Sequence, residues 1–428
     1  MQKLLDFLQK VAQTKELRSK LLFTAGIFLV YRFLAHVPVP SVDIARLKLL
    51  FESNQFLNLV NVFSGGALAN FSVVAVGISP YITASIIMQL AGMVIPQLKA
   101  LQKEEGEAGR ERVNQYTRLL TVPLAVAQSV SVLALLRSTQ YLGDVGPLGL
   151  AAMILSLVAG SMIVMWLGEL ISLSGIGNGI SLILFAGIVS QIPSSITQLQ
   201  LLIETDQLLT VASFGVVFIM IIGLVVFMNE AVRKVSIQYA KRMRGSSIVG
   251  GQVTHLPIRV NVAGVMPIIF AVSVMLAPSF VARVLSGTAN PQFQEWGRFL
   301  TVNFQQTSTL YMVLYFLIVF FFTFFSALIF FDAENLSSEL KKSGAFIPGI
   351  RPGGPTKKYL EFVVSRITIA GAVFLSFIAL MPSLAQVLTG VQTLAVSGTS
   401  VLIVVSVILE TAKQAESMLV QDNYERFL

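Results

Sequence analysis

SNQFLNLVNVFSGGALANFSVVAVGISPYITASIIMQLAGMVIPQL, residues 53–98, contains no Asp, Glu, Lys or Arg. About 20 apolar residues cross a bilayer as one helix, so this stretch is too long for one span. Because its middle is polar, the remaining apolar residues are too few for two spans. The second half has the composition of a complete span, whereas residues 58–68 form a short amphipathic piece with the pair Gly65-Gly66. Non-helical backbone is tolerated at membrane depth only inside protein or beside water. Two interpretations of the first half stay open: a half-helix that re-enters a central cavity, or an interfacial helix or loop on the outer face.

The rest of the chain also has the composition of a membrane protein. Of its 428 residues, 55% are hydrophobic and 12% are charged, against about 25% charged residues in a soluble protein. This composition argues strongly against a soluble enzyme. The chain has no Cys and only His36 and His255 as histidines, which excludes a disulfide framework, a thiolate nucleophile and a multi-histidine metal site. We expect no enzymatic activity, no cofactor and no metal.

Similar charge-free runs recur along the chain and predict ten membrane-spanning helices. Two long runs are divided, one at residues 175–179 and one between Pro382 and Gly398, where turn-forming residues gather. The ten ranges are roughly 21–37, 73–96, 117–137, 148–171, 179–195, 208–229, 258–283, 308–331, 362–384 and 394–412. The predicted fold class is therefore an all-α polytopic membrane protein.

The positions of the cations predict the orientation, because short cytoplasmic loops retain Lys and Arg. In this arrangement 24 of the 30 Lys and Arg fall in the two tails and in the loops after the second, sixth and eighth helices. Both termini are then cytoplasmic, as an even number of spans requires. The net charge of +8 needs no nucleic-acid-binding domain as its explanation. We expect a multi-pass membrane protein with both termini in the cytoplasm.

Ionisable residues inside the predicted spans are few: Arg32, His36 and Glu169. Such residues are costly in a membrane and usually mark ion or substrate paths. Arg32 and His36 lie one helical turn apart near the outer boundary, where snorkelling or pairing within the bundle is favoured over a proton relay. Glu169 begins the Gly-rich turn and is expected to face the cytoplasm. So small a set argues against an ion-coupled transporter, and the absence of a charged ring gives no support to a simple ion channel.

Two predicted cytoplasmic loops, at about 230–257 and 332–361, are much longer than the roughly 2 to 8 residues that connect helices in a bundle. In the second loop, Pro and Gly fix turns from which Arg351 projects. The residues alone leave two interpretations open. The loops either form an exposed contact surface or are solvated connections whose cations only satisfy the orientation.

Ordered motifs over nearly the whole chain give it a specific family resemblance. They are NVFSGGAL (61–68), GISPYITASII (77–87), QKEEGE (102–107), MWLGE (165–169), GIGNGIS (175–181), YAKR (239–242), THLP (254–257), VN (260–261), GVMP (264–267), KKSGAFIPGIRPG (341–353) and GTS (398–400). The chain resembles the SecY family, the central subunit of the bacterial protein-conducting channel, and is similar to the Sec61 alpha subunit of eukaryotes.

The resemblance implies two inverted five-helix halves around a central pore. The N-terminal half would comprise residues 1–195, followed by a hinge loop at 196–207 and a C-terminal half at 208–428. A repeat with an odd number of helices re-enters the membrane from the opposite face, which agrees with inverted halves.

By the same resemblance, an aliphatic ring forms the narrowest part of the pore. Its members are Ile78, Ile82, Leu184, Ile269 and Ile403. An apolar constriction dewets and blocks ions without binding them. Leu184 stands where many relatives have isoleucine, a change that keeps the aliphatic character.

The resemblance also implies two movable parts. A short re-entrant plug helix at about 58–70 would seat under the ring, with matching residues Asn61, Phe63, Ser64, Gly65 and Gly66. A lateral gate would lie between the second and seventh helices, and its polar cluster matches Thr83, Gln89 and Asn261. Hydrogen bonds in membranes contribute only about 0.6 to 2 kcal/mol each, so such a gate could open readily.

The resemblance implies that the long loops are docking surfaces for the motor ATPase SecA and for the ribosome. It also implies the cell inner (plasma) membrane, or a thylakoid membrane, as the location. Arg351 matches a docking arginine in one loop, and the other loop supplies Lys241, Arg242 and Arg244. Ser246 and Ser247 stand where many relatives carry arginine, so the resemblance does not fix the strength or choice of one cytosolic partner. The other implied partners are the small membrane subunits SecE and SecG, unfolded preproteins and membrane lipids.

The implied function is a passive channel that passes unfolded preproteins across the membrane and releases transmembrane segments sideways into lipid. No GxxxxGK[ST] motif is present, so the energy must come from a partner or from the membrane potential. Two alternatives are an ion-coupled secondary transporter and a membrane scaffold whose basic loops only recruit partners.

Overall fold

The computed structural model describes residues 14–39, 61, 64–103, 106–138, 146–193, 196–197, 208–239, 242–244, 247–249, 253–262, 264, 266–286, 290–389 and 393–425. Phe63, Lys241 and Ser246 lie outside the described residues. So do residues 58–60 of the expected plug and most of the expected hinge loop at 196–207.

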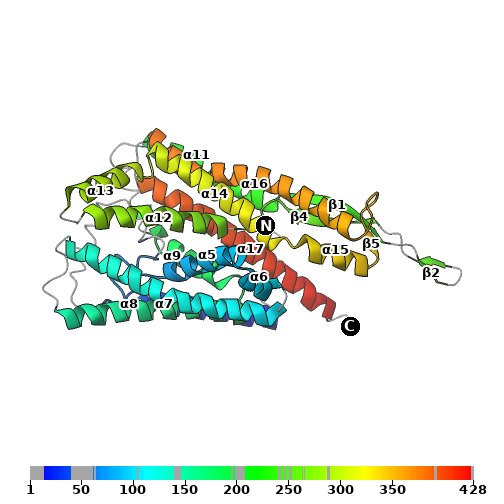
Figure 1. The fold of residues 1–428 in the computed structure, drawn as a ribbon, viewed down its shortest axis with the longest axis horizontal. Helices are drawn as coiled ribbons and strands as arrows, with labels where there is room; N and C mark the ends of the chain where they lie inside the picture. The colour runs from blue at the N-terminus through cyan, green and yellow to red at the C-terminus, as the bar shows by residue number, and fades with distance from the viewer. Residues whose placement is uncertain are drawn as a thin grey trace.

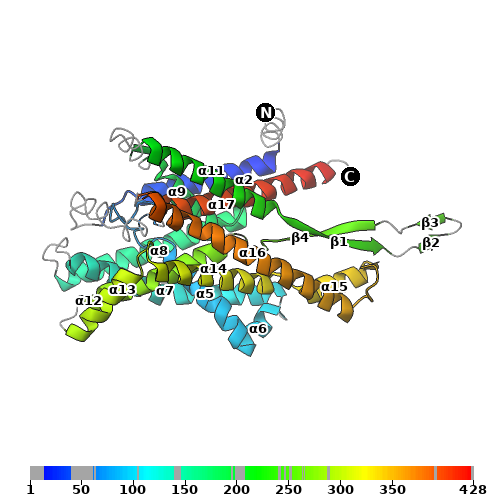
Figure 2. The ribbon, with the colours of Figure 1, turned by 90° about the horizontal axis from the view of Figure 1, so that it is seen from above.

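A first group of helices runs from α2 to α9 (Figures 1 and 2). Its members are α2 (Lys15–Leu34), α5 (Ser79–Val94), α6 (Pro96–Lys103), α7 (Gly106–Ser138), α8 (Pro147–Ser174) and α9 (Gly179–Val189). Helix α7 packs against both α5 and α8, while α9 packs on α8 and α2 lies against α8 and α9. Several of these helices are apolar on most sides, as expected for helices surrounded by lipid and by one another.

A tight turn between α8 and α9 divides one long charge-free run into two helices. Asn178 caps α9, because its side-chain oxygen accepts hydrogen bonds from the backbone N–H groups of Ile180 and Ser181 at 3.1 and 3.3 Å. Gly179 allows a close approach, since a Cβ at this position would lie 1.8 Å from the carbonyl oxygen of Gly168. The sequence places a break at this point, and the structure confirms it.

A second group of helices runs from α11 to α17. Its members are α11 (Leu208–Glu230), α12 (Met266–Ser286), α13 (Pro291–Asn303), α14 (Thr309–Phe330), α15 (Ala333–Lys342), α16 (Gly354–Thr389) and α17 (Thr393–Glu425). Helix α16 contacts α14, α11 and α17, and α12 contacts α13 and α14. The two groups meet along two lines: α17 packs against α9 and α2, and α12 packs against α5 and α7.

Each of the ten ranges predicted to span a membrane contains a helix within the described residues. Two of these helices begin later than the sequence predicts. Helix α5 begins at Ser79 rather than near residue 73, because Gly77 has a positive φ of 61° and a proline occupies the first turn of the helix. Helix α12 begins at Met266 rather than near residue 258, because the chain remains in a strand as far as Arg259.

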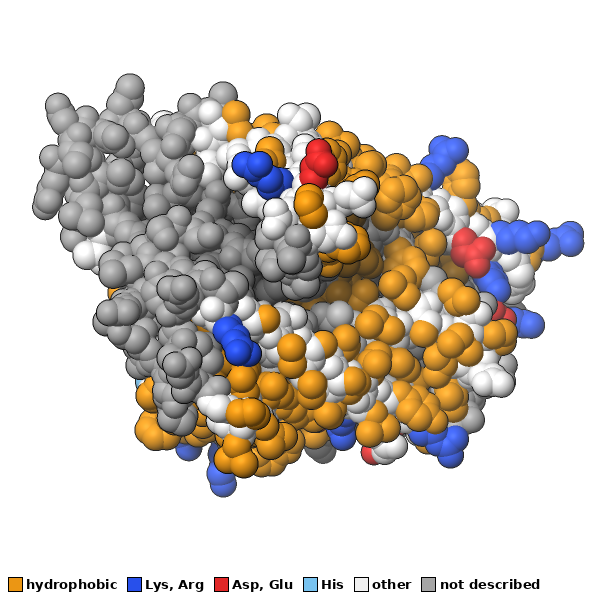
Figure 3. All heavy atoms as spheres, turned by 60° about the vertical axis from the view of Figure 1, so that its left-hand side comes forward, with side chains coloured by type: hydrophobic (Ala, Val, Ile, Leu, Met, Phe, Trp, Pro, Cys, Tyr) orange, Lys and Arg blue, Asp and Glu red, His pale blue; other side chains and the backbone are white. Residues whose placement is uncertain are grey.

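The outer surface of the helices is apolar. Four described helical stretches are long and apolar enough to cross a membrane by length and composition: Glu111–Ala134, Pro147–Ser174, Thr309–Lys342 and Gly354–Val387. Shorter apolar helices lie at Gly179–Val189, Gly215–Glu230 and Met266–Met275. Large side chains such as Leu29, Leu155 and Ile219 are exposed, and hydrophobic side chains cover much of the described face in Figure 3. These properties are those of a polytopic membrane protein.

A small sheet departs from the predicted all-α fold. β1 (Val232–Tyr239) pairs antiparallel with β4 (Val253–Arg259), and β5 (Ala345–Phe346) pairs with β1, which gives the order β4-β1-β5. Along β1, Val235 and Ile237 are buried and Ser236 between them is exposed, which is the alternation of a half-buried strand. Beyond β1 and β4, β2 (Arg242–Arg244) pairs with β3 (Ser247–Val249).

The two long loops thereby form one unit, made of β1, β4, β5 and α15, which we call the hairpin body. Its core joins side chains from the two loops and from the start of α16: Val235, Ile237, Ile258, Leu340, Ile347 and Leu360. Asp332 caps α15, because its side chain accepts hydrogen bonds from the backbone N–H groups of Glu334 and Asn335. The loops are therefore folded structure with a buried core of their own.

The hairpin body lies at one end of the helix bundle, and β2 and β3 project farthest from it (Figure 2). The C-terminal end of α17 lies toward the same end, whereas α13 lies at the opposite end (Figure 1). This grouping agrees with the sequence-based placement of both long loops and the C-terminal tail on one side of a membrane.

Candidate functional site

The candidate site is a buried apolar cluster where the two groups of helices meet. It contains all five residues of the predicted ring: Ile78, Ile82, Leu184, Ile269 and Ile403. Each of them is at most 5% exposed. They come from α5 and the residue before it, α9, α12 and α17, so both groups contribute. The structure therefore brings together residues that are far apart in the sequence.

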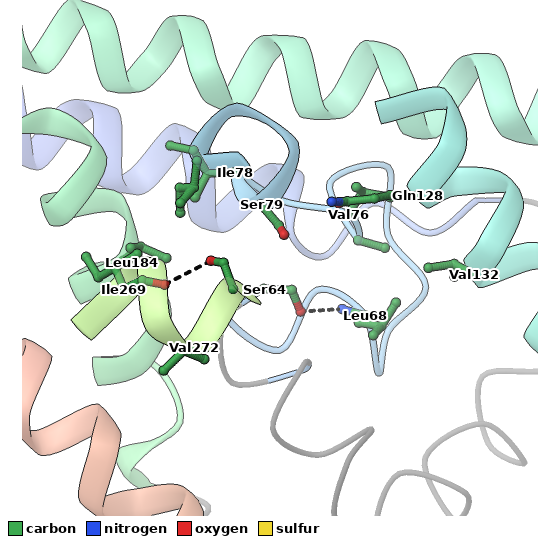
Figure 4. Close-up of a pocket in the computed structure, with 13 residues that line it drawn as sticks. Ser64, Leu68, Val76, Ile78, Ser79, Gln128, Val132, Leu184, Ile269 and Val272 are labelled. Atoms are coloured by element: carbon green, nitrogen blue, oxygen red, sulfur yellow. Dashed lines mark hydrogen bonds between the residues drawn. The ribbon is translucent and has the colours of Figure 1, made fainter. Parts of the chain in front are cut away.

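A cavity lies next to this cluster (Figure 4). Ile78, Leu184 and Ile269 line one part of it, while Leu68 and Val132 line another. The cavity has a volume of about 50 Å³, which is room for roughly four water molecules. Two lining hydroxyls already donate hydrogen bonds, from Ser64 to the Asn61 carbonyl and from Ser273 to the Ile269 carbonyl. The space is thus enclosed mainly by apolar groups, which hold water and ions weakly.

The turn at residues 64–70 forms part of the cavity wall. Residues 64–70 are in turns, whereas the resemblance implies a short helix over about 58–70; among the described residues of that range, Asn61 is helical. Asn61 organises the turn, because its side-chain oxygen accepts from the N–H of Ala69 at 2.8 Å and its carbonyl accepts from the N–H of Gly66 at 2.9 Å. Ser64 and Leu68 are buried. This part of the 53–98 stretch therefore lies inside the protein and not as an interfacial helix on its outer face.

Donors on α2 and just after α9 hold the same turn by its backbone carbonyls. The Tyr31 hydroxyl donates to the carbonyl of Ser64 at 3.2 Å, and Arg32 donates to the carbonyl of Gly65 at 3.0 Å. Gln191, which follows α9, donates from Nε2 to the carbonyl of Asn61 at 3.0 Å. Arg32 thus pairs within the bundle, as the sequence favoured, although its partner was not predictable.

The three predicted gate residues do not hydrogen-bond to one another in the described structure. Thr83 donates to the carbonyl of Ser79 and Gln89 donates to the hydroxyl of Ser85, so both bonds stay within α5. Asn261 lies before α12 and donates to Asn229 of α11 at 3.1 Å. Helices α5 and α12 do contact each other, but their contact is not built on this polar cluster. The gate assignment stays a prediction.

Sequence reasoning missed several partners near the predicted residues. Asn229 also donates to the hydroxyl of Ser406 on α17 at 3.1 Å, so it joins α11, α17 and the segment before α12. Glu169 accepts from Nε of Arg118 at 2.7 Å and ties α8 to α7. Asn229 lies beside Glu230 at the end of a charge-free run, which was the only local signal for its importance.

The predicted docking arginine lies on a braced loop of the hairpin body. Arg351 is exposed, and its carbonyl accepts from the hydroxyl of Thr356 at 2.9 Å. The hydroxyl of Ser337 on α15 donates to the carbonyl of Gly353 at 2.8 Å. The backbone beneath Arg351 is therefore fixed from two sides. Among the other candidates, Arg242 and Arg244 lie on β2.

Comparison with known proteins identifies the family. The SecY family model matches residues 72–412. The protein translocase subunit SecY of Streptomyces coelicolor is 43% identical, covering 97% of this chain and 98% of the relative. That of Mycobacterium tuberculosis is 42% identical over the same shares. The chain belongs to the SecY family.

Solved structures support the same fold for this SecY-family chain. One described as the structure of a protein conducting channel gives a TM-score of 0.64 at 18% identity and covers 94% of this chain and 92% of that chain. Sec61 from a canine ribosome-channel complex of the endoplasmic reticulum gives a TM-score of 0.59 at 17% identity over the same shares.

These comparisons confirm the predicted family, the mainly helical channel fold and the assignment as a protein translocase channel rather than an enzyme. They give no support to the ion-coupled transporter. The roles of the ring, the plug, the lateral gate and the docking loops stay predictions.

Proposed function

We propose that this SecY-family chain passes unfolded polypeptides through the seam between its two groups of helices. The observation that carries the proposal is the apolar cluster, in which side chains from four helices and both groups meet beside a buried turn. A passage that must admit chains of every composition cannot rely on specific polar contacts. Aliphatic side chains can shift around a passing chain, and when none is present they exclude water and ions.

The turn at 64–70, together with the rest of 58–70, acts as the plug. It lines the same cavity as Ile78, Leu184 and Ile269. If the turn moved away, the passage next to these three side chains would become wider. Gly65 and Gly66 have positive φ angles of 68° and 80°, a backbone conformation that glycine adopts without a steric penalty. The described residues 64–70 form a compact turn, which we propose moves as a unit.

Apolar segments leave sideways between α5 and α12. These helices belong to different groups and touch along the seam. Because Thr83 and Gln89 hydrogen-bond within α5, parting the helices leaves these two side chains satisfied. The main change is the exposure of apolar side chains, which lipid or an apolar segment of the passing chain then covers. The gate residues therefore give the opening a polar lining and do not hold α5 and α12 together by hydrogen bonds to one another.

The division into residues 1–195 and 208–428 follows the two groups of helices, with the hinge at 196–207. Contacts of α17 with α9 and α2 lie on one side of the seam, and contacts of α12 with α5 and α7 lie on the other. If the two groups rotated about the contacts of α17 with α9 and α2, the contacts of α12 with α5 and α7 would open. The inverted relation of the two halves is part of this proposal.

The hairpin body serves as the docking surface for cytosolic partners. Its exposed Arg351 and the arginines of β2 suit the motor ATPase SecA and the phosphates of ribosomal RNA. Solved relatives include Sec61 in a ribosome-channel complex and a yeast Ssh1 complex bound to the 80S ribosome. SecE and SecG complete the membrane complex. Both termini and the hairpin body face the cytoplasm, and the membrane is the plasma membrane or a thylakoid membrane.

Reconstituted vesicles test the proposal. Vesicles that contain this chain with SecE and SecG should protect an unfolded preprotein from added protease when SecA and ATP are present. Deletion of residues 58–70 should raise the resting ion leak in bilayer recordings, because the constriction loses its cover. An unchanged leak would remove the plug assignment, and a failure to protect any preprotein would contradict the channel.

A further inference from the structure

Arg32 joins three segments of the chain at the plug turn. It lies in the last turn of α2, and one nitrogen of its guanidinium, Nη1, donates to the carbonyl of Gly65 and to Oγ of Ser190, both at 3.0 Å. Ser190 is the C-cap residue of α9. The Ser190 hydroxyl donates to the carbonyl of Gly187 at 2.6 Å and also lies 3.3 Å from the carbonyl of Gly65, so its oxygen can accept from Arg32.

Two glycines make this contact sterically feasible. A Cβ on Gly187 would lie 3.0 Å from Cα of Gly65. A Cβ on Gly65 would lie 2.7 Å from Cα of Gly187 and 2.6 Å from the Tyr31 hydroxyl. The turn therefore approaches α9 backbone to backbone, and a side chain at either position would push it away from Arg32 and Ser190.

The turn is held by hydrogen bonds on one side and by apolar packing on the other. On the side of α2 and α9, donors reach the carbonyls of Asn61, Ser64 and Gly65. On the side of α7 and α8, Leu68 belongs to an apolar cluster with residues such as Leu133 and Leu157. Apolar contacts are non-directional and allow sliding, whereas a charge-assisted hydrogen bond depends on its geometry. The hydrogen bonds that fix the position of the turn therefore come from the side of α2 and α9.

We propose that Arg32, Ser190 and Gly187 form a latch that holds the turn at residues 64–66 in the closed position. The latch rests on the proposed plug role of 58–70. It is reversible, because Arg32 lies in the last turn of α2, where a cation also interacts favourably with the C-terminal carbonyls of the helix. When the turn leaves, the half-buried guanidinium gains water and stays near the C-terminal end of α2, so opening does not leave a buried charge without a partner.

The chain has no cysteine, which allows a direct measurement of plug position. Leu68→Cys introduces a single thiol at a buried position of the plug, and its rate of labelling by a membrane-impermeant thiol reagent reports how often the plug leaves. In this background, Arg32→Gln should raise the labelling rate about 10- to 100-fold, because a charge-assisted hydrogen bond to a buried carbonyl is removed. Arg32→Lys should give a smaller rise, since it keeps the charge with fewer donors.

Two further variants test the latch without altering Arg32. Ser190→Ala removes the second acceptor, and Gly187→Ala displaces the turn sterically, so both should raise the labelling rate and the resting ion leak. Gly223→Ala is the control for the glycine, because a Cβ there meets nothing within 4 Å. Arg298→Gln on α13 is the control for loss of one exposed positive charge.

The outcomes separate the latch from the plug. If deletion of 58–70 raises the leak but the Arg32, Ser190 and Gly187 variants keep wild-type labelling and leak, the latch is wrong and the plug stands. If the deletion leaves the leak unchanged, the plug itself is wrong. A poorly folded Arg32→Gln protein does not decide the matter, because Ser190→Ala and Gly187→Ala must show the effect on their own.

Discussion

At the scale of single residues, the position of Ile78 depends on two neighbouring residues of α8. Ser161 donates from its hydroxyl to the carbonyl of Gly77 at 2.8 Å. Gly160 leaves space for the turn before α5, since a Cβ there would lie 2.0 Å from the carbonyl oxygen of Val73. One hydroxyl and one missing side chain therefore fix the backbone from which the first ring residue projects.

We predict that Gly160→Ala destabilises the protein by about 1 to 3 kcal/mol, because the added methyl group overpacks a contact with backbone that cannot yield. The melting temperature in detergent should fall. Gly215→Ala in α11 is the matched control: a Cβ there meets nothing within 4 Å, and alanine favours a helix over glycine by roughly 0.5 to 1 kcal/mol. Equal melting temperatures for the two variants would contradict the proposed close approach.

The residues of the site were predictable to very different degrees. Ile269 and Ile403 look like ordinary packing residues on their own, and only the family motifs around them point to a ring. Arg32 stood out as a charge within a span, but its contact with Gly65 joins residues 33 positions apart and has no signal in either local sequence. The polar partners of Asn261 were missed for the same reason.

At the scale of elements, the helices were predictable and the hairpin body was not. Long apolar runs mark the spans directly, because lipid requires them. β1 and β2 carry several charged residues, while β3 and β5 have only three and two residues, so their sequences resemble solvated loops. Their third strand, β5, comes from a different loop, and the pairing of Tyr239 with Ala345 depends on contacts that no local pattern encodes.

The braced loop of the hairpin body leads to a prediction about docking. We expect Arg351→Glu to weaken SecA binding about 30-fold or more, because reversing a charge within a docked interface costs at least about 2 kcal/mol. Binding to reconstituted vesicles and SecA-driven preprotein protection are the measurements. Arg298→Glu on α13 is the control, since it makes the same charge change at an exposed position outside both long loops. Full activity of Arg351→Glu would reduce this loop to a solvated connection whose cations only set the orientation.

At the scale of the whole molecule, the distribution of contacts separates closure from partner binding. The proposed closure uses one buried apolar cluster shared by both groups of helices, with polar contacts to the turn at 64–70 and to Asn61 from α2 and from Gln191 after α9. The proposed docking uses a separate unit at one end of the bundle, with its own core. The sequence predicted the helices on both sides of the seam, but the seam itself arises only from how they pack.

This separation predicts how salt affects the two activities. Binding of a cationic surface to ribosomal RNA releases counterions, so ribosome binding to vesicles should fall linearly on a plot of log affinity against log salt concentration. Arg351→Glu should make the slope shallower by about 0.7 to 0.9 for each phosphate that the altered surface no longer neutralises.

Arg298→Glu on α13, at the opposite end of the bundle (Figure 1), should leave the slope of ribosome binding unchanged. The resting ion leak should show no comparable rise with salt beyond the change in bulk conductivity, because apolar side chains close the path and added ions do not screen their packing. A slope that both reversals change equally would mean that the net charge of +8, and not the hairpin body, attracts the ribosome.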